Sequence, residues 1–294
     1  MTGEPFACVD IGSNTTRLLV AAWDGSRLRE LMTQRVYTRL GKAIRKSGAI
    51  PPDAIASETD VVATQVRHAR ELGARQIRIV ATAAIRQARN GDELARSIEA
   101  TTAQPAEILT DAEEARLAFL GASRSLGSAP EGTLGVLDVG GGSTELAAGT
   151  ANDGVTWLAS FAIGSGFMAD SYLHSDPPSP HELHAVLQHA KGCFEGLDAP
   201  AVDRAVAVGG SATALRRVAG GELSHEALER AIRIVATAPS DEVAERFELD
   251  AERVRLLPAG ILIIDAVSEA VGWRLKIGGG GLREGCILEM ASAA

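Results

Sequence analysis

Two glycine-rich segments of this chain have the same build, and both are suited to holding phosphate. The first reads Asp10-Ile11-Gly12-Ser13-Asn14-Thr15-Thr16, and the second reads Asp138-Val139-Gly140-Gly141-Gly142-Ser143-Thr144. Each follows a short apolar run, and a constant offset of 128 residues separates them, from Asp10 to Asp138 and from Thr16 to Thr144. Glycines let backbone N–H groups close around an anion, and the hydroxyl groups add further donors.

A carboxylate begins each of these segments. Asp10 and Asp138 stand where an apolar strand is expected to end, directly before the glycines. Carboxylate oxygens suit a hydrated divalent metal that accompanies phosphate, so both residues are candidate metal ligands. Two such loops in matching contexts predict a duplicated domain, with the ligand in a cleft that the two copies share.

The second feature that could take part in chemistry is a pair of adjacent carboxylates at the start of an expected helix. An amphipathic helix is predicted over 112–126, and Asp111 can cap it. The segment Thr110-Asp111-Ala112-Glu113-Glu114 therefore leads into its first turn. Helical neighbours point about 100° apart, so only one of Glu113 and Glu114 can enter a cleft. One interpretation is a general base that orients and deprotonates water, and the other is favourable negative charge at a helix N-terminus.

Two more glycine-rich turns lie between a strand and a helix. In Val208-Gly209-Gly210-Ser211, the helix N-terminus with Ser211 could bind phosphate or a nucleotide, or the glycines could serve close packing. The turn over 278–281 presents Arg283 at a helix start. Its guanidinium could bind two phosphate oxygens at once, or it could form an ion pair with Glu284.

The remaining pattern predicts strands and helices in alternation. Gly73 ends a helix over 53–72, another helix follows Gly91, the stretch 125–132 is the expected linker, and helices also fill the second half up to a last one from about 282. Strands are expected over 6–11, 17–23, 26–32, 34–38, 76–81, 107–109, 133–138, 144–149, 155–160, 204–208 and 274–277. Such a chain is an α/β protein that binds ligands at the strand ends.

The composition is that of a folded cytoplasmic protein. Its 294 residues are 46% hydrophobic and 23% charged, and their number permits two domains. We expect no signal peptide because the first strand begins by Phe6, and no membrane span because Asp265 interrupts the strongest apolar run. Cys8, Cys193 and Cys286 have no metal-binding spacing and are expected to be buried free thiols.

The formal net charge of −9 argues against nucleic-acid binding, but the charge is unevenly distributed. Residues 27–46 contain seven Lys and Arg residues and a single acid, Glu30, which makes this stretch +6 and leaves −15 for the rest. A basic island in an acidic protein can steer a polyanion towards one place. The alternative is an ordinary solvated hairpin and loop.

Taken together, these motifs resemble the exopolyphosphatase/guanosine pentaphosphate phosphatase (Ppx/GppA) family, over nearly the whole chain and in order. The matching segments are Asp10-Ile11-Gly12-Ser13-Asn14 with Arg17, Ala81-Thr82-Ala83-Ala84-Ile85-Arg86 with Asn90, Glu113-Glu114-Ala115-Arg116-Leu117, Asp138 to Leu146, Gly209-Gly210-Ser211, Pro258-Ala259-Gly260 and Gly281-Leu282-Arg283-Glu284-Gly285. The resemblance implies two actin-like (ribonuclease H-like) α/β domains of the actin/sugar-kinase/Hsp70 superfamily with an interdomain cleft. We expect them over 1–130, joined by the final helix 285–294, and over 131–284.

The resemblance also implies an activity, namely Mg²⁺-dependent attack of water on the terminal phosphoryl group of linear polyphosphate. By motif position, Glu114 is the base, Asp138 and Glu145 hold the metal and the water, and Asp10 remains a further metal candidate. Mn²⁺ could substitute for Mg²⁺, and a monovalent cation could take part. The implied phosphate-binding and charge-neutralising residues are Ser13, Asn14, Arg17, Arg86, Gly140, Gly141, Gly142, Ser143, Ser211 and Arg283.

Two departures from the family pattern carry expectations of their own. Thr110-Asp111 stands where the family more often has a Ser-Gly-type pair before the glutamates. Long members have additional helical domains after the GLREG helix, whereas this sequence resembles the short, two-domain branch. We therefore expect a preference for short polyphosphate chains and limited processivity.

Other functions remain open alternatives. Guanosine pentaphosphate 5′-phosphohydrolase activity needs the same catalytic residues, a sugar or acid kinase shares the superfamily, and a polyphosphate or alarmone sensor would keep the fold without turnover. The chain lacks the Walker A and G-x-S-x-G motifs, which argues against P-loop and α/β-hydrolase enzymes. Expected partners are polyphosphate and guanosine penta- or tetraphosphate, without nucleic acid or membrane, and a homodimer is possible.

Overall fold

The computed structural model describes residues 3–126 and 131–293, which form two compact units. The first unit is Met1–Ser128 together with Gly280–Ala294, and the second is Ala129–Gly279. The domain boundary expected at residues 130 and 131 touches the stretch 127–130, which lies outside the described residues. The expected domain limits therefore stay a prediction, and each unit is described by itself.

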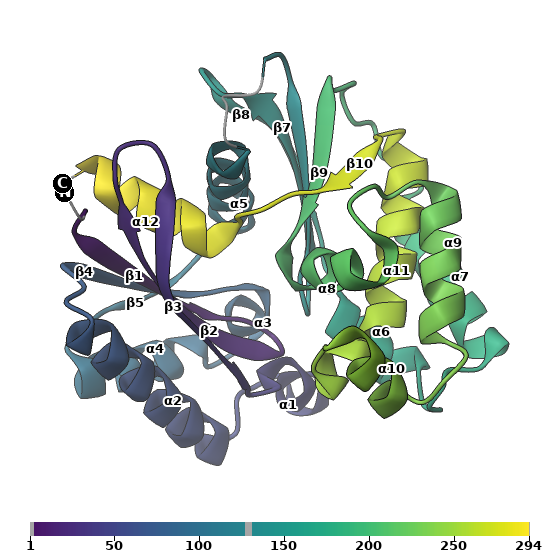
Figure 1. Ribbon diagram of the computed structural model, residues 1–294. Helices are drawn as coiled ribbons and strands as arrows, with labels where there is room; N and C mark the ends of the chain where they lie inside the picture. Colours follow the sequence, from purple (N-terminus) through teal and green to yellow (C-terminus); the bar gives the residue numbers. More distant parts are fainter. Residues whose placement is uncertain (1–2, 127–130, 294) are drawn as a thin grey trace. The chain divides into compact units, whose positions relative to one another are not determined.

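The first unit is built on a five-stranded mixed sheet (Figure 1). Its spatial order is β3-β2-β1-β4-β5, with β1, β2 and β3 antiparallel and β4 and β5 added in parallel. The strands are β1 (Pro5–Ile11), β2 (Thr15–Trp23), β3 (Leu28–Tyr37), β4 (Gln76–Ala81) and β5 (Ala106–Ile108).

The prediction of separate strands over 26–32 and 34–38 is wrong, because β3 is one continuous strand. It pairs with β2 along its whole length, from Leu28 opposite Trp23 to Tyr37 opposite Thr15. The register shifts by one residue where Glu30 pairs with Ala21 and Met32 with Val20. The additional residue, Leu31, is thus absorbed as a bulge and does not end the strand.

The two faces of this sheet pack against different helices. Ala7, Val9 and Ile11 of β1 contribute to one core, which includes residues of α2 and α4, whereas Phe6 and Cys8 belong to another, which includes residues of α5 and α12. This alternation follows from the two-residue period of a strand. The helices of the unit are α1 (Leu40–Ser47), α2 (Pro52–Glu71), α3 (Ala83–Gln87), α4 (Gly91–Thr102), α5 (Asp111–Ser125) and α12 (Leu282–Ala293).

Helix α1 overlaps the end of the basic stretch 27–46, for which an ordinary solvated hairpin and loop was the alternative. Leu40 and Ile44, four residues apart, are buried on one helical face, while Lys42, Arg45 and Lys46 are exposed. Gly48 ends the helix in the left-handed conformation at φ 71°. The sequence pattern missed this helix because it spans only two turns.

Glycines let α5 and α12 pack in direct backbone contact. A Cβ atom on Gly285 would overlap with the carbonyl group of Leu117, and one on Gly121 would overlap with the carbonyl oxygen of Gly281. Both helices belong to the first unit, and Leu117 and Cys286 share its second core. Glycine is therefore required at these two positions for packing.

We expect Gly285→Ala to lower the free energy of unfolding by about 3 kcal/mol, because backbone atoms of α5 cannot move aside cheaply. Gly192→Ala in α7 (Pro180–Phe194) is the matched control, since nothing lies within 4 Å of its added Cβ. That control should gain about 0.5–1 kcal/mol from helix propensity. Urea unfolding of both variants measures the difference, and equal stabilities would contradict the packing argument.

The second unit repeats the connectivity of the first. Its strands are β6 (Leu134–Val139), β7 (Thr144–Thr150), β8 (Gly154–Phe161), β9 (Arg204–Val208) and β10 (Leu275–Ile277), in the order β8-β7-β6-β9-β10. The register is also repeated at an offset of 128 residues. Asp10 pairs with Arg17 and Val80, and Asp138 pairs with Glu145 and Val208. The predicted duplication is thus confirmed in the strand register.

Helices of the second unit enclose its core on one face of the sheet. Leu137 and Val139 of β6 pack there against residues of α7 and of the long apolar α11, which contains Pro258. The helices are α6 (Ser165–Tyr172), α7, α8 (Gly209–Ala219), α9 (His225–Val235), α10 (Ser240–Phe247) and α11 (Ala251–Val271).

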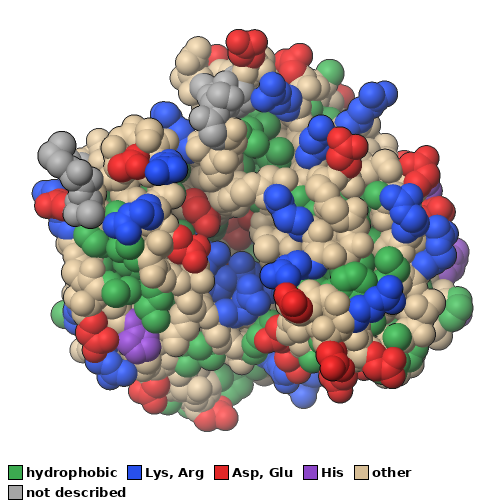
Figure 2. Space-filling model, in the orientation of Figure 1, with side chains coloured by type: hydrophobic (Ala, Val, Ile, Leu, Met, Phe, Trp, Pro, Cys, Tyr) green, Lys and Arg blue, Asp and Glu red, His purple; other side chains and the backbone are tan. Residues whose placement is uncertain are grey.

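Many charged side chains lie on the face of the molecule shown in Figure 2. On the face shown in Figure 2, acidic and basic side chains are interspersed and hydrophobic ones occur in small groups. Within the described ranges, no helix combines the length and the apolar character needed to cross a bilayer. The three cysteines are free and Cys8 and Cys286 are buried, as predicted, but Cys193 is partly exposed, so the prediction of burial is wrong for that residue.

Candidate active site

The two adjacent glutamates in the first turn of α5 have different contacts. The Thr110 hydroxyl accepts a hydrogen bond from the Glu113 N–H at 3.2 Å, and the Glu113 carboxylate accepts one from the Thr110 N–H at 2.8 Å. This reciprocal capping box uses Thr110 as the N-cap, so the expectation that Asp111 caps the helix is wrong. The hydrogen bonds from Thr110 lower the pKa of Glu113. Glu113 therefore serves the helix end.

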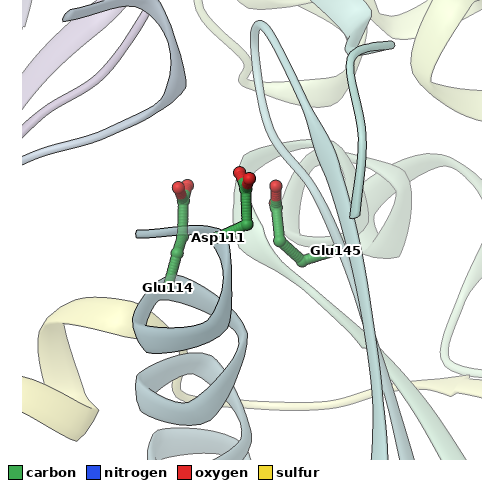
Figure 3. Close-up of side chains that lie close together, drawn as sticks. All are labelled: Asp111, Glu114 and Glu145. Carbon is green, nitrogen blue, oxygen red and sulfur yellow. The ribbon is translucent and has the colours of Figure 1, made fainter. Parts of the chain in front are cut away.

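Glu114 has a different environment. It is only 9% exposed, and Nη1 of Arg86 lies 3.3 Å from its Oε2. The same guanidinium donates to the carbonyl oxygen of Leu109 at 2.6 Å and pairs with Asp111. Asp111 and Glu114 project from the same turn, with carboxylate oxygens within 4.8 Å of each other (Figure 3). Arg86, Asp111 and Glu114 thus form one ion-pair cluster, and Glu114 is the better candidate for the base.

The first glycine-rich loop is closed by its own backbone and by α1. The Gly12 N–H donates to the Thr15 carbonyl oxygen at 3.0 Å. The Ser13 carbonyl accepts from the Gly41 N–H at 2.7 Å, and the Asn14 carbonyl accepts from the amides of Thr38 and residue 39 at 3.2 and 3.1 Å. Backbone amides at the end of β3 and in α1 therefore hold the loop through its carbonyl oxygens. The Ser13 side chain is buried.

Asp10 lies next to two arginines of the first unit. Burial raises the pKa of its carboxyl group, whereas the positive charges of Arg17 and Arg283 lower it. Arg17 is its direct partner across β1 and β2, and Arg283 also donates weakly to the carbonyl oxygen of Leu18 at 3.5 Å. The structure thus places Arg283 beside β2 and Asp10, and its role in binding phosphate stays a prediction.

The second glycine-rich loop is held by the start of α6. The Gly140 carbonyl accepts from the N–H and the hydroxyl of Ser165 at 2.9 and 3.1 Å, and the Gly141 carbonyl accepts from the Phe167 N–H at 2.9 Å. A Cβ on Gly164 would lie 2.6 Å from backbone atoms of Gly141 and Gly142. Sequence reasoning missed Gly164 and Ser165, although the run Gly164-Ser165-Gly166 was a visible signal of close backbone packing.

Asp138 and Glu145 form a pair of carboxylates on neighbouring strands. They are direct partners across β6 and β7, so their side chains share one face of the sheet, opposite the core that contains Leu137 and Leu146. Glu145 is buried, and its Oε1 accepts from the Ser160 hydroxyl at 3.2 Å. Like charges in this arrangement repel, and a divalent cation would offset the repulsion.

This donor set fits magnesium. Hard carboxylate oxygens are the ligands that Mg²⁺ prefers, and the glycines of the second loop follow Asp138 directly in sequence. In the first unit the equivalent position to Glu145 holds Arg17, which supplies positive charge beside Asp10 from the protein itself. Asp10 therefore faces an arginine in its strand pair, whereas Asp138 faces a second carboxylate, and the assignment of metal ligands stays a prediction.

The third glycine-rich turn, at the start of α8, is packed closely on both sides. Gly209 adopts φ +81°, and a Cβ there would overlap with Oδ1 of Asp138. A Cβ on Gly260 of α11 would lie 2.7 Å from the Ser211 hydroxyl oxygen. The packing function of these glycines is thus clear, and it places Ser211 beside α11.

Arg253 is a further residue of this region that sequence reasoning missed. It is only 6% exposed, which is unusual for arginine, and its guanidinium nitrogens lie 2.8 and 3.0 Å from where a Cβ of Gly210 would be. It belongs to the first turn of α11, ahead of the Pro258-Ala259-Gly260 segment. A single charged residue at an expected helix start carries no sequence signal that separates it from a solvated one.

The comparisons with known proteins agree with the motifs and the fold. The chain belongs to the Ppx/GppA phosphatase family, whose family model matches residues 19–294. The crystal structure of the Aquifex aeolicus family member is similar at 27% identity and a TM-score of 0.82, over 99% of this chain and 98% of that chain. The actin-like two-domain α/β fold that the resemblance implied is thereby confirmed.

Relatives with named activities fall into two groups. This chain is similar to exopolyphosphatase 1 of Mycobacterium leprae, at 27% identity over 95% of this chain and 87% of that protein. It is also similar to the guanosine-5′-triphosphate,3′-diphosphate pyrophosphatase of Vibrio vulnificus, at 26% identity over 98% of this chain. The chain spans only 59% of the Vibrio protein's length. The two names differ in the substrate, which is polyphosphate in one and guanosine-5′-triphosphate,3′-diphosphate in the other.

Proposed function

We propose that this protein is an exopolyphosphatase that hydrolyses the terminal phosphoryl group of linear inorganic polyphosphate and releases orthophosphate. The observation that carries the proposal is the environment of Glu114, a buried carboxylate beside Arg86, in a chain of the Ppx/GppA phosphatase family. A buried carboxylate held by a guanidinium is suited to accept a proton from water.

The proposed roles of the residues follow from their chemistry. Glu114 orients the attacking water and accepts its proton, while the guanidinium groups of Arg17, Arg86 and Arg283 neutralise phosphate oxygens. The amides and hydroxyls that bind phosphate are those of Ser13, Asn14, Gly140, Gly141, Gly142, Ser143 and Ser211. Phosphoryl transfer needs mainly positioning and charge neutralisation, which this set of groups can provide.

Asp138 and Glu145 are the proposed ligands of Mg²⁺, for which Mn²⁺ could substitute. When bound there, the ion would neutralise negative charge on the phosphoryl group. Two carboxylates alone repel an anionic substrate, so we expect phosphate release to stop in EDTA and to return with added Mg²⁺. Release that continues in EDTA would exclude a metal at this pair.

Charge distribution favours polyphosphate as the substrate. The basic stretch 27–46 carries a net +6 in a chain of net charge −9, and its exposed cations include Arg35, Lys42 and Lys46 on β3 and α1. Even a short chain of repeated phosphates can place several negative charges along such a stretch, whereas part of a nucleotide is uncharged. The similarity to the Vibrio protein makes guanosine pentaphosphate the second candidate substrate.

Orthophosphate release from tripolyphosphate, long polyphosphate and guanosine pentaphosphate, each with Mg²⁺, tests the proposal. Release from polyphosphate supports it, and release from the pentaphosphate alone would assign the second activity. Binding of polyphosphate without release would instead indicate a sensor. Transfer of phosphate from ATP to a sugar or acid acceptor would indicate a kinase.

A further inference from the structure

A carboxylic acid is buried on α2, apart from the residues proposed to act on phosphate. Glu58 is 1% exposed, its Oε1 accepts a hydrogen bond from the Thr16 hydroxyl, and its Oε2 has no hydrogen-bond partner within residues 3–126 and 131–293. Burial raises the pKa of Glu58, whereas the hydroxyls of Thr16 and Thr38 lower it. A buried acid without a cationic partner is costly, so its position calls for a specific reason.

Thr16 and Thr38, whose hydroxyl oxygens lie 3.4 Å apart, both adjoin the first glycine-rich loop. Thr16 directly follows residues 12–15, and Thr38 donates its amide to the Asn14 carbonyl at 3.2 Å. A second residue of α2 also contacts Thr16, because the Gln65 side chain donates a hydrogen bond to the Thr16 carbonyl oxygen at 3.3 Å. Glu58 thus contacts Thr16, and Thr16 lies beside Thr38, at the point where these two parts of the chain meet the loop.

The strand period links this contact to Arg17. Thr16 points to the face of the sheet that α2 covers, as Leu18 and Val20 do, and Arg17 points to the opposite face with Asp10. Fixing Thr16 on one face thus sets the position from which Arg17 extends on the other.

We propose that Glu58 is a positioning residue that, through Thr16 and Thr38, fixes residues 12–15 and Arg17 for phosphate binding. This inference rests on the proposed function, in which that loop and Arg17 hold phosphate. An apolar side chain of similar length would fill the same space, but it would accept no hydrogen bond from the Thr16 hydroxyl. What Glu58 supplies at this position is a directional acceptor oxygen.

Three variants separate positioning from packing. Glu58→Gln keeps an acceptor oxygen and the shape, so its kcat/KM for tripolyphosphate should stay within about twofold of the wild-type value. Glu58→Met keeps the volume without the hydrogen bonds, and its kcat/KM should fall about tenfold, mainly through KM. Thr16→Val should cause a similar loss, and the double variant Glu58→Met/Thr16→Val should lose no more than either single variant.

Thermal unfolding accompanies the kinetics, because a loss of folded protein would lower kcat rather than raise KM. A Glu58→Met enzyme with unchanged kcat/KM would overturn the proposal. So would a Glu58→Gln enzyme as impaired as the methionine variant, since the acceptor oxygen would then not be the decisive group.

Hydrogen exchange tests the same contact without any substrate. Amides of residues 12–18 should exchange at least about tenfold faster in Glu58→Met than in the wild type. The equivalent segment of the second unit, residues 140–146, is the internal control and should not change. Unchanged exchange in residues 12–18 would refute the positioning role. If instead the wild type releases no phosphate from polyphosphate, the proposed function fails while this result still decides whether Glu58 orders the loop.

Discussion

Replacing Glu114 with glutamine should reduce kcat for polyphosphate hydrolysis about 1,000-fold and leave KM nearly unchanged. Glutamine has almost the same shape and can still contact Arg86, but it cannot accept a proton from water. General-base catalysis of this kind contributes about 10²–10⁴-fold to a rate. The loss should therefore fall on the chemical step, which steady-state release of orthophosphate at saturating tripolyphosphate measures directly.

The neighbouring residue provides the control. Glu113 carries the same charge one position away, but it is engaged in the capping box with Thr110. Glutamine also serves that box, so Glu113→Gln should keep kcat within about threefold of the wild type. A Glu114→Gln enzyme that retains more than a tenth of the activity would contradict the assignment of the base, and a Glu113→Gln enzyme with the larger loss would exchange the two roles.

Gly209→Ala should lower kcat/KM at least about 100-fold, although residue 209 itself has no side chain to take part in the reaction. The added Cβ would overlap with Oδ1 of Asp138, so the carboxylate must leave its present position. Displacement of a positioned group by about 1 Å costs on the order of 100-fold in rate. Because Asp138 is a proposed ligand of the metal, the Mg²⁺ concentration needed for half-maximal activity should rise as well.

The backbone conformation of Gly209 requires its own control, because alanine is strained at φ +81° wherever it occurs. Gly220 has φ +85° with no atom within 4 Å of an added Cβ. Gly220→Ala should therefore lose about 1–3 kcal/mol of stability from strain alone and keep its activity. Equal activity losses in the two variants would show that strain, and not the displaced carboxylate, is responsible.

Sequence reasoning succeeded where the signal is local. The two glycine-rich loops can be recognised in the sequence because glycines, hydroxyls and a leading aspartate lie within seven residues. Their offset of 128 residues then predicts a duplicated domain, which the sheet register repeats. The Thr110 to Glu114 segment was also recognised as a helix start. Its cap was misassigned to Asp111 because both residue types are good N-caps, and only the hydrogen bonds distinguish them.

The features that were missed depend on contacts between residues far apart in the sequence. Glu58 is hydrogen-bonded to Thr16, which is 42 residues away in the sequence, and Ser165 is hydrogen-bonded to Gly140, which is 25 residues away. Arg253 meets Gly210 across a comparable distance along the chain. A glutamate or an arginine on an amphipathic helix is ordinarily solvated, so its type and spacing contain no information on burial.

The division of the chain into units has a consequence for the order in which the protein is made. The second unit is a single uninterrupted stretch, whereas the first needs α12, which the ribosome synthesises after the whole of the second unit. Until then Phe6, Cys8 and Leu19 lack their partners Leu282 and Cys286. Until α12 is made, only α5 is available to cover that face of the sheet, so apolar side chains stay exposed there and could be bound by a chaperone during this interval.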